Sequence, residues 1–282
     1  MTRRRLVISA FIGATVLGLA ALYQGFVSGP RDLVVRTVEI APPGWPDALD
    51  GLRVAVLSDI HTGAPGLGPS RLEQVVRETN AARPDLVLLA GDYVIQGVRG
   101  GTFVPPDETA RRLAALDAPL GCFAVLGNHD WWLDAGAVTD AFVEAGIPVI
   151  DDDALAVGDG ARSLWVAGIS DLWEGEHDWE AALACVTDDR PVIAVTHNPD
   201  IFPELSARFA LTVAGHTHGG QVALPFIGRP IVPSSYGQRY AIGHVVEDGR
   251  HLFVTPGIGT SIIPVRFRVP PEISILVLRA GG

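Results

Sequence analysis

Five short clusters of Asp, Asn and His side chains each come directly after an apolar run that is predicted to be a buried strand. Ligands in α/β folds gather at the carboxyl ends of the strands, so we expect the five clusters to meet there. Carboxylate oxygen and imidazole nitrogen together suit ions such as Zn, Mn or Fe. The candidate metal ligands are Asp59, His61, Asp92, Asn128, His197, His216 and His218.

The spacing within these clusters favours a shared site. Asp59 and His61, like His216 and His218, are i, i+2 pairs, and on an extended segment both members of such a pair point the same way. A glycine precedes Asp92 and two of the other candidates, which lets the backbone turn sharply and approach an ion or a phosphate. Buried Asp and His side chains would be poorly satisfied without a cation.

The elements that must position these clusters alternate along the chain. Strands alternating with helices predict an α/β fold, and the later part of the chain has fewer helices. We therefore expect two packed mixed β-sheets flanked by helices. The predicted strands are 52–58, 86–90, 122–126, 164–169, 192–196, 211–214, 252–255 and 273–278, and the predicted helices are 70–82, 107–116, 134–145 and 179–186.

Composition and charge limit the class of partner. Hydrophobic residues make up 48% of the 282 residues, which is enough for a sizeable core. The net charge of −11 argues against general nucleic-acid binding, which needs a basic surface. An anionic substrate stays compatible with this charge if bound metal supplies positive charge locally. Nothing in the sequence points to a protein partner.

The N-terminal segment predicts a membrane helix. Residues 6–30 contain no charged side chain, and 6–27 are mostly apolar, close to the ~20 residues that span a bilayer. Arg3, Arg4 and Arg5 precede them, so the positive-inside rule places the body outside the cytoplasm. The predicted division is an anchor or export signal at 1–30, a connector at 31–50 and one catalytic domain at 51–282.

Two interpretations of this segment stay open. One is an anchor retained in the cytoplasmic (inner) membrane, with the domain on the extracytoplasmic side. The other is an export signal of the twin-arginine type, which the residues from Thr2 to Val7 resemble, with Gly18 and Ala20 at a weak cleavage site. The sequence also leaves open whether Cys122 and Cys185 form a disulfide.

The ordered motifs DIH, GDY, GNHD, TH and GHTH resemble those of the calcineurin-like metallophosphoesterases, from Asp59 to His218. The longer strings GHTHGGQVALPFIGRP and PSSYGQRYAIG are similar to a narrower bacterial group of membrane-associated or exported phosphodiesterase-like proteins. Some relatives in that group cleave the pyrophosphate of UDP-diacylglucosamine.

The resemblance implies a site for two divalent ions, Mn, Zn or Fe, and a role for each ligand. Asp92 would bridge the two ions, and His129 would contact the phosphate and protonate the leaving oxygen. One ion would be held by Asp59, His61, Asp92 and His218, and the other by Asp92, Asn128, His197 and His216.

Three positions depart from other branches of the family. Protein phosphatases carry Asp and Arg where this chain has Ile95 and Gln96, and purple acid phosphatases carry a Tyr ligand at the position of Ile95. The soluble UDP-diacylglucosamine hydrolases have Arg at the position of His129. These differences disfavour both phosphatase classes and weaken a direct transfer of the UDP-lipid substrate.

The sequence therefore predicts a two-metal phosphodiesterase or pyrophosphatase that acts on a lipid-linked or envelope phosphoester. One alternative is a phosphodiesterase for soluble nucleotides or other small diesters, and another is a non-catalytic metal-binding scaffold. Asp171, Trp173 and Arg239 are candidate substrate-binding residues, since they follow predicted strands near the same rim or lie in the second motif string.

Overall fold

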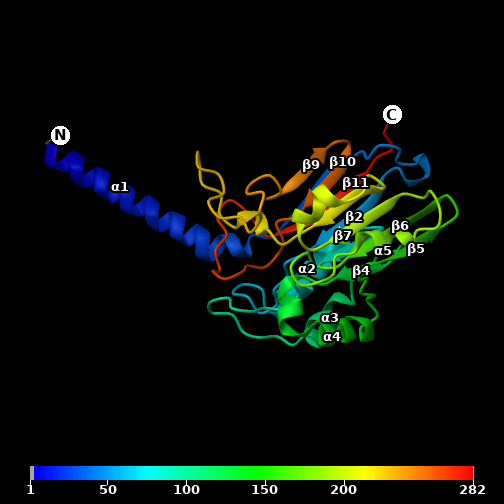
Figure 1. The fold of residues 1–282 in the computed structure, drawn as a ribbon. Helices are drawn as coiled ribbons and strands as arrows, with labels where there is room; N and C mark the ends of the chain where they lie inside the picture. The colour runs from blue at the N-terminus through cyan, green and yellow to red at the C-terminus, as the bar shows by residue number, and fades with distance from the viewer. Residues whose placement is uncertain (1–2, 282) are drawn as a thin grey trace.

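The computed structural model describes residues 3–281, so Met1 and Thr2, at the start of the predicted export signal, lie outside it. Helix α1 (Arg3–Tyr23) projects away from a two-sheet body, as Figure 1 shows. It continues through two short helical turns, η1 (Gln24–Ser28) and η2 (Gly29–Arg31), which join it to the body. In the described chain, one helix is long and apolar enough to cross a membrane, over Phe11–Arg31.

The first sheet has five strands in the order β1-β11-β2-β3-β4. Strands β2, β3 and β4 are parallel, β11 is antiparallel to β2, and β1 is parallel to β11. The strands are β1 (Val34–Ile40), β2 (Leu52–Leu57), β3 (Leu86–Ala90), β4 (Cys122–Val125) and β11 (Glu272–Leu278).

The second sheet has six strands in the order β5-β6-β7-β8-β10-β9. Its centre is parallel from β6 to β10, and its two edge strands are antiparallel to their neighbours. The prediction of two mixed sheets is confirmed. The strands are β5 (Asp153–Asp159), β6 (Arg162–Ile169), β7 (Val192–Thr196), β8 (Phe209–Ala214), β9 (Gly243–Glu247) and β10 (Arg250–Val254).

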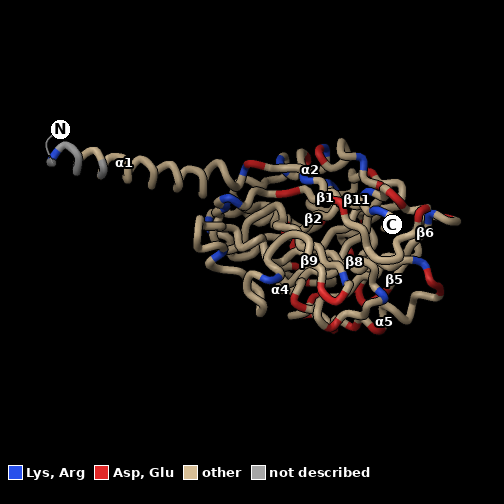
Figure 2. Tube along the Cα trace, turned by 90° about the horizontal axis from the view of Figure 1, so that it is seen from above, with Lys and Arg blue, Asp and Glu red and all other residues tan. Residues whose placement is uncertain are grey.

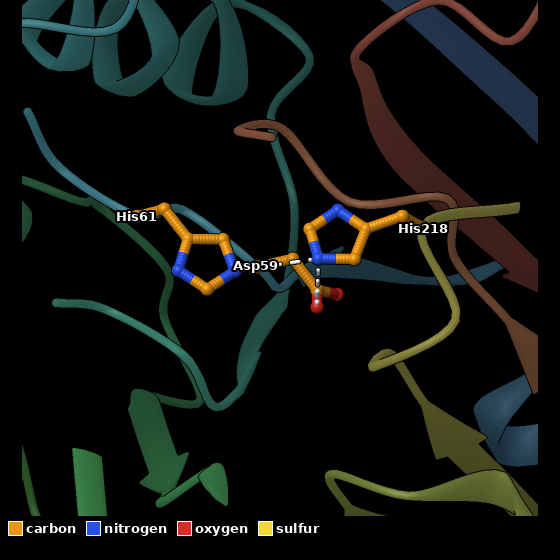
Figure 3. Close-up of side chains that lie close together, drawn as sticks. All are labelled: Asp59, His61 and His218. Atoms are coloured by element: carbon orange, nitrogen blue, oxygen red, sulfur yellow. Dashed lines mark hydrogen bonds and ion pairs between the residues drawn. The ribbon is translucent and has the colours of Figure 1, made fainter. Parts of the chain in front are cut away.

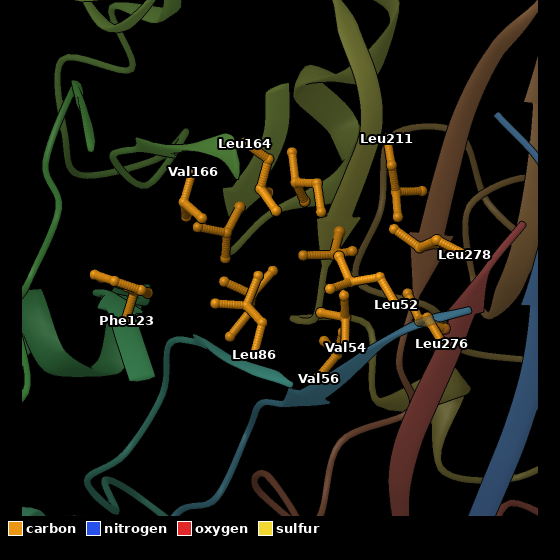
Figure 4. Close-up of a cluster of buried hydrophobic side chains, with 14 of the residues drawn as sticks. Leu52, Val54, Val56, Leu86, Phe123, Leu164, Val166, Leu211, Leu276 and Leu278 are labelled. Atoms are coloured by element: carbon orange, nitrogen blue, oxygen red, sulfur yellow. The ribbon is translucent and has the colours of Figure 1, made fainter. Parts of the chain in front are cut away.

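The main core fills the space between the two sheets. Leu86 and Val56 of the first sheet lie opposite Val166 and Leu164 of the second, all buried, as Figure 4 shows. Such interdigitated aliphatic side chains supply the main driving force for packing two sheets. The core therefore fixes the carboxyl ends of β2, β3, β7 and β8 relative to one another.

Helices cover the outer faces. Apolar residues at helical spacing on α2, such as Leu72 and Val76, pack with α3 and α4 on the first sheet. α5 and the 3₁₀ helix η4 pack on the second sheet. The helices are α2 (Pro69–Ala81), α3 (Pro106–Leu113), α4 (Asn128–Glu144), α5 (Trp179–Ala184) and η4 (Pro199–Glu204), with single turns η3 (Asp47–Leu49) and η5 (His218–Gly220).

The sequence patterns do not predict strands β1, β5 and β9, all of which lie at sheet edges. β1 lies in the range 31–50 that the sequence assigns to a connector, yet it pairs along its whole length with β11. The folded body therefore begins before residue 51. β1 and β5 expose more than half of their residues to solvent, and β9 has no fully buried residue. Apolar periodicity reports burial, so it fails on strands of this kind.

Helix α4 begins at Asn128, six residues before the predicted start at Asp134. Asp134 has φ 178° and ψ 100°, an extended conformation that breaks the helix into two parts. The sequence pattern identifies only the second part. The first turn contains Asn128 and His129, so the third motif lies at a helix N-terminus rather than in a loop.

Candidate metal centre

The loops after β2, β3, β4, β7 and β8 bring all seven predicted ligands to one place between the ends of the two sheets. Each of the seven residues is at most 5% exposed. Burial of this many polar groups is costly unless they are paired with one another or with a cation. In three overlapping groups of side chains, the ligand atoms lie within 4.8 Å of one another. These groups are Asp59, His61 and His218, then His61, Asp92 and His129, and then Asp59, Asp92 and His197.

The first set comprises Asp59, His61 and His218, shown in Figure 3. His218 Nε2 lies 3.2 Å from Asp59 Oδ1 and 3.3 Å from His61 Nε2. His61 Nδ1 lies 2.9 Å from the carbonyl oxygen of Val94, a contact that requires the proton on Nδ1. The lone pair of His61 Nε2 therefore points towards the other two side chains.

A further set of side chains, formed by His197, His216 and Asn128, lies beside Asp92. His197 Nε2 lies 3.3 Å from Asp92 Oδ2 and 3.2 Å from His216 Nδ1. His216 Nδ1 also lies 3.0 Å from Asn128 Oδ1. The Nδ1 of His197 is 2.7 Å from the carbonyl oxygen of Ala90, so this ring also carries a proton on Nδ1 when it is neutral. These are the residues that the family resemblance assigns to the second ion.

Asp92 lies between the two sets. Its Oδ2 is 3.3 Å from His197 Nε2 and 3.5 Å from His61 Nε2. A single carboxylate oxygen between two imidazole nitrogens of different sets is the arrangement expected of a bridging ligand. Asp92 is therefore placed where the bridging ligand implied by the resemblance would have to lie.

The donor set fits two divalent cations. His216 Nε2 and His218 Nδ1 are buried, and within the described part of the chain neither has a hydrogen-bond partner. Nitrogen lone pairs and carboxylate oxygens face one another across both sets, which is unfavourable unless a proton or a cation lies between them. Mixed imidazole and carboxylate ligands are typical of Zn, Mn and Fe.

The backbone at the ligands is not extended, contrary to the sequence expectation. Asp59, His61, Asp92, His216 and His218 have φ between 45° and 67°, in the left-handed region that non-glycine residues rarely adopt. The members of each i, i+2 pair therefore converge because of tight left-handed turns and not because of strand alternation. Backbone strain of this kind clusters at functional sites, where the surrounding structure holds it.

The glycines that precede three of the ligands allow neighbouring loops to approach one another closely. A Cβ on Gly91 would collide with the backbone of Gly127, and one on Gly127 would collide with Asp92. A Cβ on Gly215 would overlap Ser58 and Asp59. The loops of different strands can therefore touch only because these positions carry no side chain.

The charges of the buried imidazoles differ sharply. Burial lowers the pKa of His61 to about 4 and that of His216 to about 3, so both rings are neutral at pH 7. Burial also opposes the charge on His197, but Asp92 outweighs it and raises the pKa of His197 to about 10. His197, more than any other group, in turn holds the pKa of the buried Asp92 carboxyl well below its usual range. The opposite charges of His197 and Asp92 thus stabilise each other within the centre.

His129 lies beside the centre, with a ring nitrogen within 4.8 Å of ligand atoms of His61 and Asp92. Its backbone N–H donates to Asp92 Oδ1 at 2.9 Å, and its ring centroid is 4.7 Å from those of His61 and Trp132. Its Nδ1 is buried without a partner. The ring lines the cavity that opens from the centre.

This catalytic cavity has a volume of about 660 Å³. Its floor includes Asp92, Asn128 and His216. Two tryptophans stand at its rim: Trp173 meets the ring of His216 edge-on at 4.4 Å, and the indole N–H of Trp132 donates to Glu174 at 2.7 Å. The remaining wall is largely aliphatic and includes Val222, Pro230, Ile231, Pro233, Ile262, Ile263 and Val265.

The three candidate substrate residues have different positions. Trp173 lines the cavity. Asp171 is fully buried behind it, where Oδ2 accepts hydrogen bonds from the backbone N–H groups of Trp173 and Glu174. Arg239 is not among the lining residues and forms a surface ion pair with Glu247, with Nε and Oε1 2.6 Å apart. Of the three, Trp173 lines the cavity, Asp171 is buried close to it in the chain, and Arg239 lies at the surface.

Two supporting residues were missed by the sequence analysis. Asp130 accepts backbone hydrogen bonds from the loop that carries Asp92. Arg266 is fully buried, and its guanidinium donates only to backbone carbonyl oxygens, including those of Pro256 and Gly259. Asp130 is visible in the GNHD motif, whereas nothing in the sequence marks Arg266 as buried.

The two-sheet fold and this cluster of carboxylate, amide and imidazole groups define a metal-dependent hydrolase. The family model for calcineurin-like phosphoesterases matches residues 52–220, more than half of the chain. The chain belongs to the calcineurin-like phosphoesterase family, whose members hydrolyse phosphoester bonds with bound metal.

Curated relatives agree with this assignment. An uncharacterized metallophosphoesterase, YkuE, from Bacillus subtilis (strain 168) is 30% identical over 83% of this chain and 82% of its own length. Phosphodiesterase YaeI from Escherichia coli (strain K12) is 30% identical over 70% of this chain and 71% of its own length. A transmembrane protein with metallophosphoesterase domain from Danio rerio is 30% identical over 94% of this chain, which spans 61% of that protein.

Proposed function

We propose that this chain is a membrane-anchored phosphodiesterase or pyrophosphatase that hydrolyses a lipid-linked or envelope phosphoester. The observation that carries the proposal is the two-sided character of the catalytic cavity. One part of its lining belongs to the metal centre, and much of the rest is aliphatic. Two of the aliphatic residues, Val222 and Val265, also line a cavity against Leu22 and Phe26 of the N-terminal helical segment. A phosphate attached to an apolar chain matches both sides, because the head group needs cations and the chain needs an apolar wall.

In this proposal the seven ligands act as the family resemblance implies. Asp59, His61 and His218 would hold one ion with Asp92, which would bridge to the other. The second ion would be completed by Asn128, His197 and His216. When bound, two divalent cations would neutralise charge on the phosphoryl oxygens and lower the pKa of an attacking water molecule.

His129 would act as the general acid. Burial lowers its pKa, so the ring is neutral at pH 7 in the free protein. A bound phosphate carries negative charge to this ring and favours its protonated form. The ring can then donate its proton to the leaving oxygen, a role that contributes about 10²–10⁴-fold to the rate.

The membrane part of the proposal rests on α1. Its apolar window is 6% buried in the structure, so the body does not cover it, and a bilayer would. Relatives from Danio rerio and Bos taurus are named transmembrane proteins. With Arg4 and its neighbours on the cytoplasmic side, the catalytic domain would lie outside the inner membrane. Cleavage of the segment as an export signal is the alternative.

A comparison of substrates tests the proposal. The full chain, reconstituted in lipid nanodiscs and loaded with Mn²⁺, is given phospholipid diesters and lipid pyrophosphates in the same disc, and soluble nucleotide diesters in parallel. We expect a higher kcat/KM for the lipid substrates. Preference for soluble diesters would refute the lipid assignment and leave the reaction class intact. Tight Mn²⁺ binding without turnover of any phosphoester would indicate a non-catalytic scaffold.

A further inference from the structure

Five large apolar side chains are exposed on two neighbouring loops. Phe226, Ile227 and Ile231 lie on the loop after η5, and Ile262 and Ile263 lie on the loop after β10. Their exposed fractions range from 45% for Ile263 to 109% for Phe226. Scattered apolar side chains on a surface are normal, but a contiguous group of this size marks an interaction site. We call these five residues the apolar collar.

Hydrogen bonds join the two loops into one surface. Gln221 is the centre of this network: its Oε1 accepts from the N–H of Ser261 at 2.9 Å, and its carbonyl oxygen accepts from the N–H of Phe267 at 2.9 Å. The N–H of Ala223 donates to the carbonyl oxygen of Phe267 at 2.9 Å. The side chains of the apolar collar are therefore carried by a single braced unit.

The apolar collar surrounds the mouth of the catalytic cavity on one side. Ile231, Ile262 and Ile263 line that cavity as well as being exposed. Phe226 and Ile227 do not line it and stand further out, at the tip of a turn closed by the paired hydrogen bonds of Leu224 and Gly228. The apolar collar thus extends the aliphatic wall of the cavity outwards to this tip. Arg229, next to the turn, donates from its Nε–H to the carbonyl oxygen of Gly219 at 2.8 Å.

The same loops hold the end of α1. The N–H of Arg266 donates to the carbonyl oxygen of Gly25 at 2.9 Å. Val222 and Val265 line the catalytic cavity and also a second cavity of about 420 Å³, whose other wall includes Leu22 and Phe26. Figure 1 shows these yellow and orange loops next to the point where α1 meets the body. The apolar collar and the membrane-length helix therefore form one continuous apolar region.

Charge distinguishes this face from the rest of the molecule. The chain has a net charge of −11, yet the segments 93–106, 219–246 and 255–271 contain five arginines and no Asp or Glu. Arg99 and Arg268 in these segments are exposed. Many of the acidic segments lie around α5 and β5, at the end of the body away from α1 (Figure 2). Of the five arginines, Arg266 is buried and Arg239 is paired with Glu247, so Arg99, Arg229 and Arg268 supply the positive charge of this face. Such a face is compatible with an anionic lipid surface, which would repel the remainder of the body.

We propose that the apolar collar inserts into the interface of the bilayer that α1 crosses, so that the mouth of the catalytic cavity opens directly onto lipid. This inference rests on the membrane anchor of the proposed function and names the surface through which the site reaches its substrate. A helix that crosses the bilayer brings the surface at its end against the head groups, and large apolar side chains there bury about 5–10 Å deep. A phosphoester lipid can then enter the cavity while its chains stay in an apolar environment.

Depth-dependent quenching tests the docking without any substrate. The full chain with Cys185→Ser is reconstituted in vesicles of phosphatidylethanolamine and phosphatidylglycerol, and an NBD fluorophore is attached at Ile227→Cys or Ile263→Cys. Burial raises the pKa of the remaining Cys122 thiol to about 12, so it stays unreactive during labelling. The matched control is Leu155→Cys on β5, an exposed apolar residue remote from α1.

We expect lipids with shallow doxyl labels to quench both collar probes at least about twofold more than the Leu155→Cys probe. Equal, weak quenching at all three positions would overturn the inference. So would a blue-shifted, unquenched signal at the collar, because it would mean that a protein, such as a second copy of this chain, covers the surface.

An activity measurement separates this inference from the proposed function. The double variant Phe226→Ser, Ile227→Ser changes residues outside the cavity. We expect kcat/KM for a lipid diester in the same vesicle to fall about tenfold, with hydrolysis of soluble bis(p-nitrophenyl) phosphate unchanged within about twofold. An equal loss on both substrates, or no loss on either, would contradict docking. If the wild type quenches as expected but hydrolyses no lipid, the docking stands and the lipid-substrate assignment fails.

Discussion

The backbone N–H of Asp92 donates a 2.8 Å hydrogen bond to Oδ2 of Asp130, so the third motif holds the loop of the second motif in place. The same carboxylate accepts from the N–H groups of Tyr93 at 2.9 Å and Gly127 at 3.0 Å. It is fully buried and lies two residues after Asn128 in the chain. Asp130 thus positions two candidate ligands without facing the metal centre.

Replacing Asp130 with Asn should damage both stability and metal binding. The amide nitrogen of Asn would face a backbone N–H, so at least one buried donor would lose its acceptor, at a cost of about 1–3 kcal/mol in the free energy of unfolding. Asp92 would also be less firmly held. We expect a lower melting temperature and weaker binding of Mn²⁺ in a calorimetric titration.

Asp140→Asn is the control for this variant, since Asp140 is exposed on the same helix. Asp140→Asn should leave the melting temperature and the affinity for Mn²⁺ unchanged within error. A variant Asp130→Asn that binds Mn²⁺ as tightly as the wild type would show that the hydrogen bonds do not position Asp92.

Metal binding should release a proton from His197. Its pKa is raised to about 10, so the ring is protonated at pH 7, and its Nε2 can bind a cation only after losing that proton. Affinity for Mn²⁺ should therefore rise about tenfold per pH unit between pH 7 and 8. The rise should be steeper near pH 6, because burial raises the pKa of the Asp59 carboxyl to about 6, and Asp59 then also loses a proton on binding metal. His61 and His216, whose pKa values burial lowers to about 4 and about 3, add nothing to this slope, because they are already neutral there.

The proton can be counted by calorimetry in buffers of different ionisation enthalpy. We expect about one proton released per protein when the centre fills at pH 7. Binding enthalpies that do not depend on the buffer, together with a flat pH dependence, would mean that His197 is neutral in the free protein.

His129→Ala should keep the metals and lose turnover. The side chain lies beside the ligands, while its backbone N–H, which bonds Asp92, is retained in the variant. We expect a fall in kcat of about 10²–10⁴-fold with unchanged metal content. His244→Ala, at an exposed position of β9, is the matched control. Full activity of His129→Ala on a substrate with a poor leaving group would rule out the acid role.

The order of elements was predictable from the sequence because the central strands are buried on both faces. Runs such as 86–90 and 192–196 are continuously apolar and coincide with β3 and β7. β1 and β5 were not predictable by the same signal, because charged residues such as Arg36 and Asp159 occupy their exposed positions. The break at Asp134 hid the start of α4 for a related reason, since it interrupts the helical period.

The set of candidate ligands was readable from the sequence, because polar residues directly after buried strands must share one edge of the fold. The way in which these side chains converge could not be predicted from the sequence. Spacing alone suggests extended pairs, whereas His216 and His218 adopt left-handed backbone conformations that tertiary contacts impose. The buried position of Arg266 was equally hidden, because its partners are carbonyl oxygens and no side chain in the sequence signals them.

Arg266 connects the N-terminal helical segment to the candidate metal centre. Its guanidinium donates to the carbonyl oxygens of Gly259 at 2.6 Å and Pro256 at 2.8 Å, and the N–H of Gly259 donates to the carbonyl oxygen of Asp59 at 2.6 Å. Its backbone N–H bonds Gly25 beyond the end of α1. Burial lowers the pKa of Arg266 to about 10, so the side chain remains charged at neutral pH.

Arg266→Met should therefore destabilise the fold and loosen the Asp59 loop together. The variant leaves several buried carbonyl oxygens without donors, at about 1–3 kcal/mol each, so we expect the free energy of unfolding in detergent to fall by about 3–5 kcal/mol. Mn²⁺ affinity should fall as well, because Gly259 no longer supports Asp59. Arg268→Met, at an exposed position two residues away, should change stability by less than about 0.5 kcal/mol. If the two variants melt at the same temperature, the guanidinium does not hold these loops, and the connection between α1 and the centre must run through other contacts.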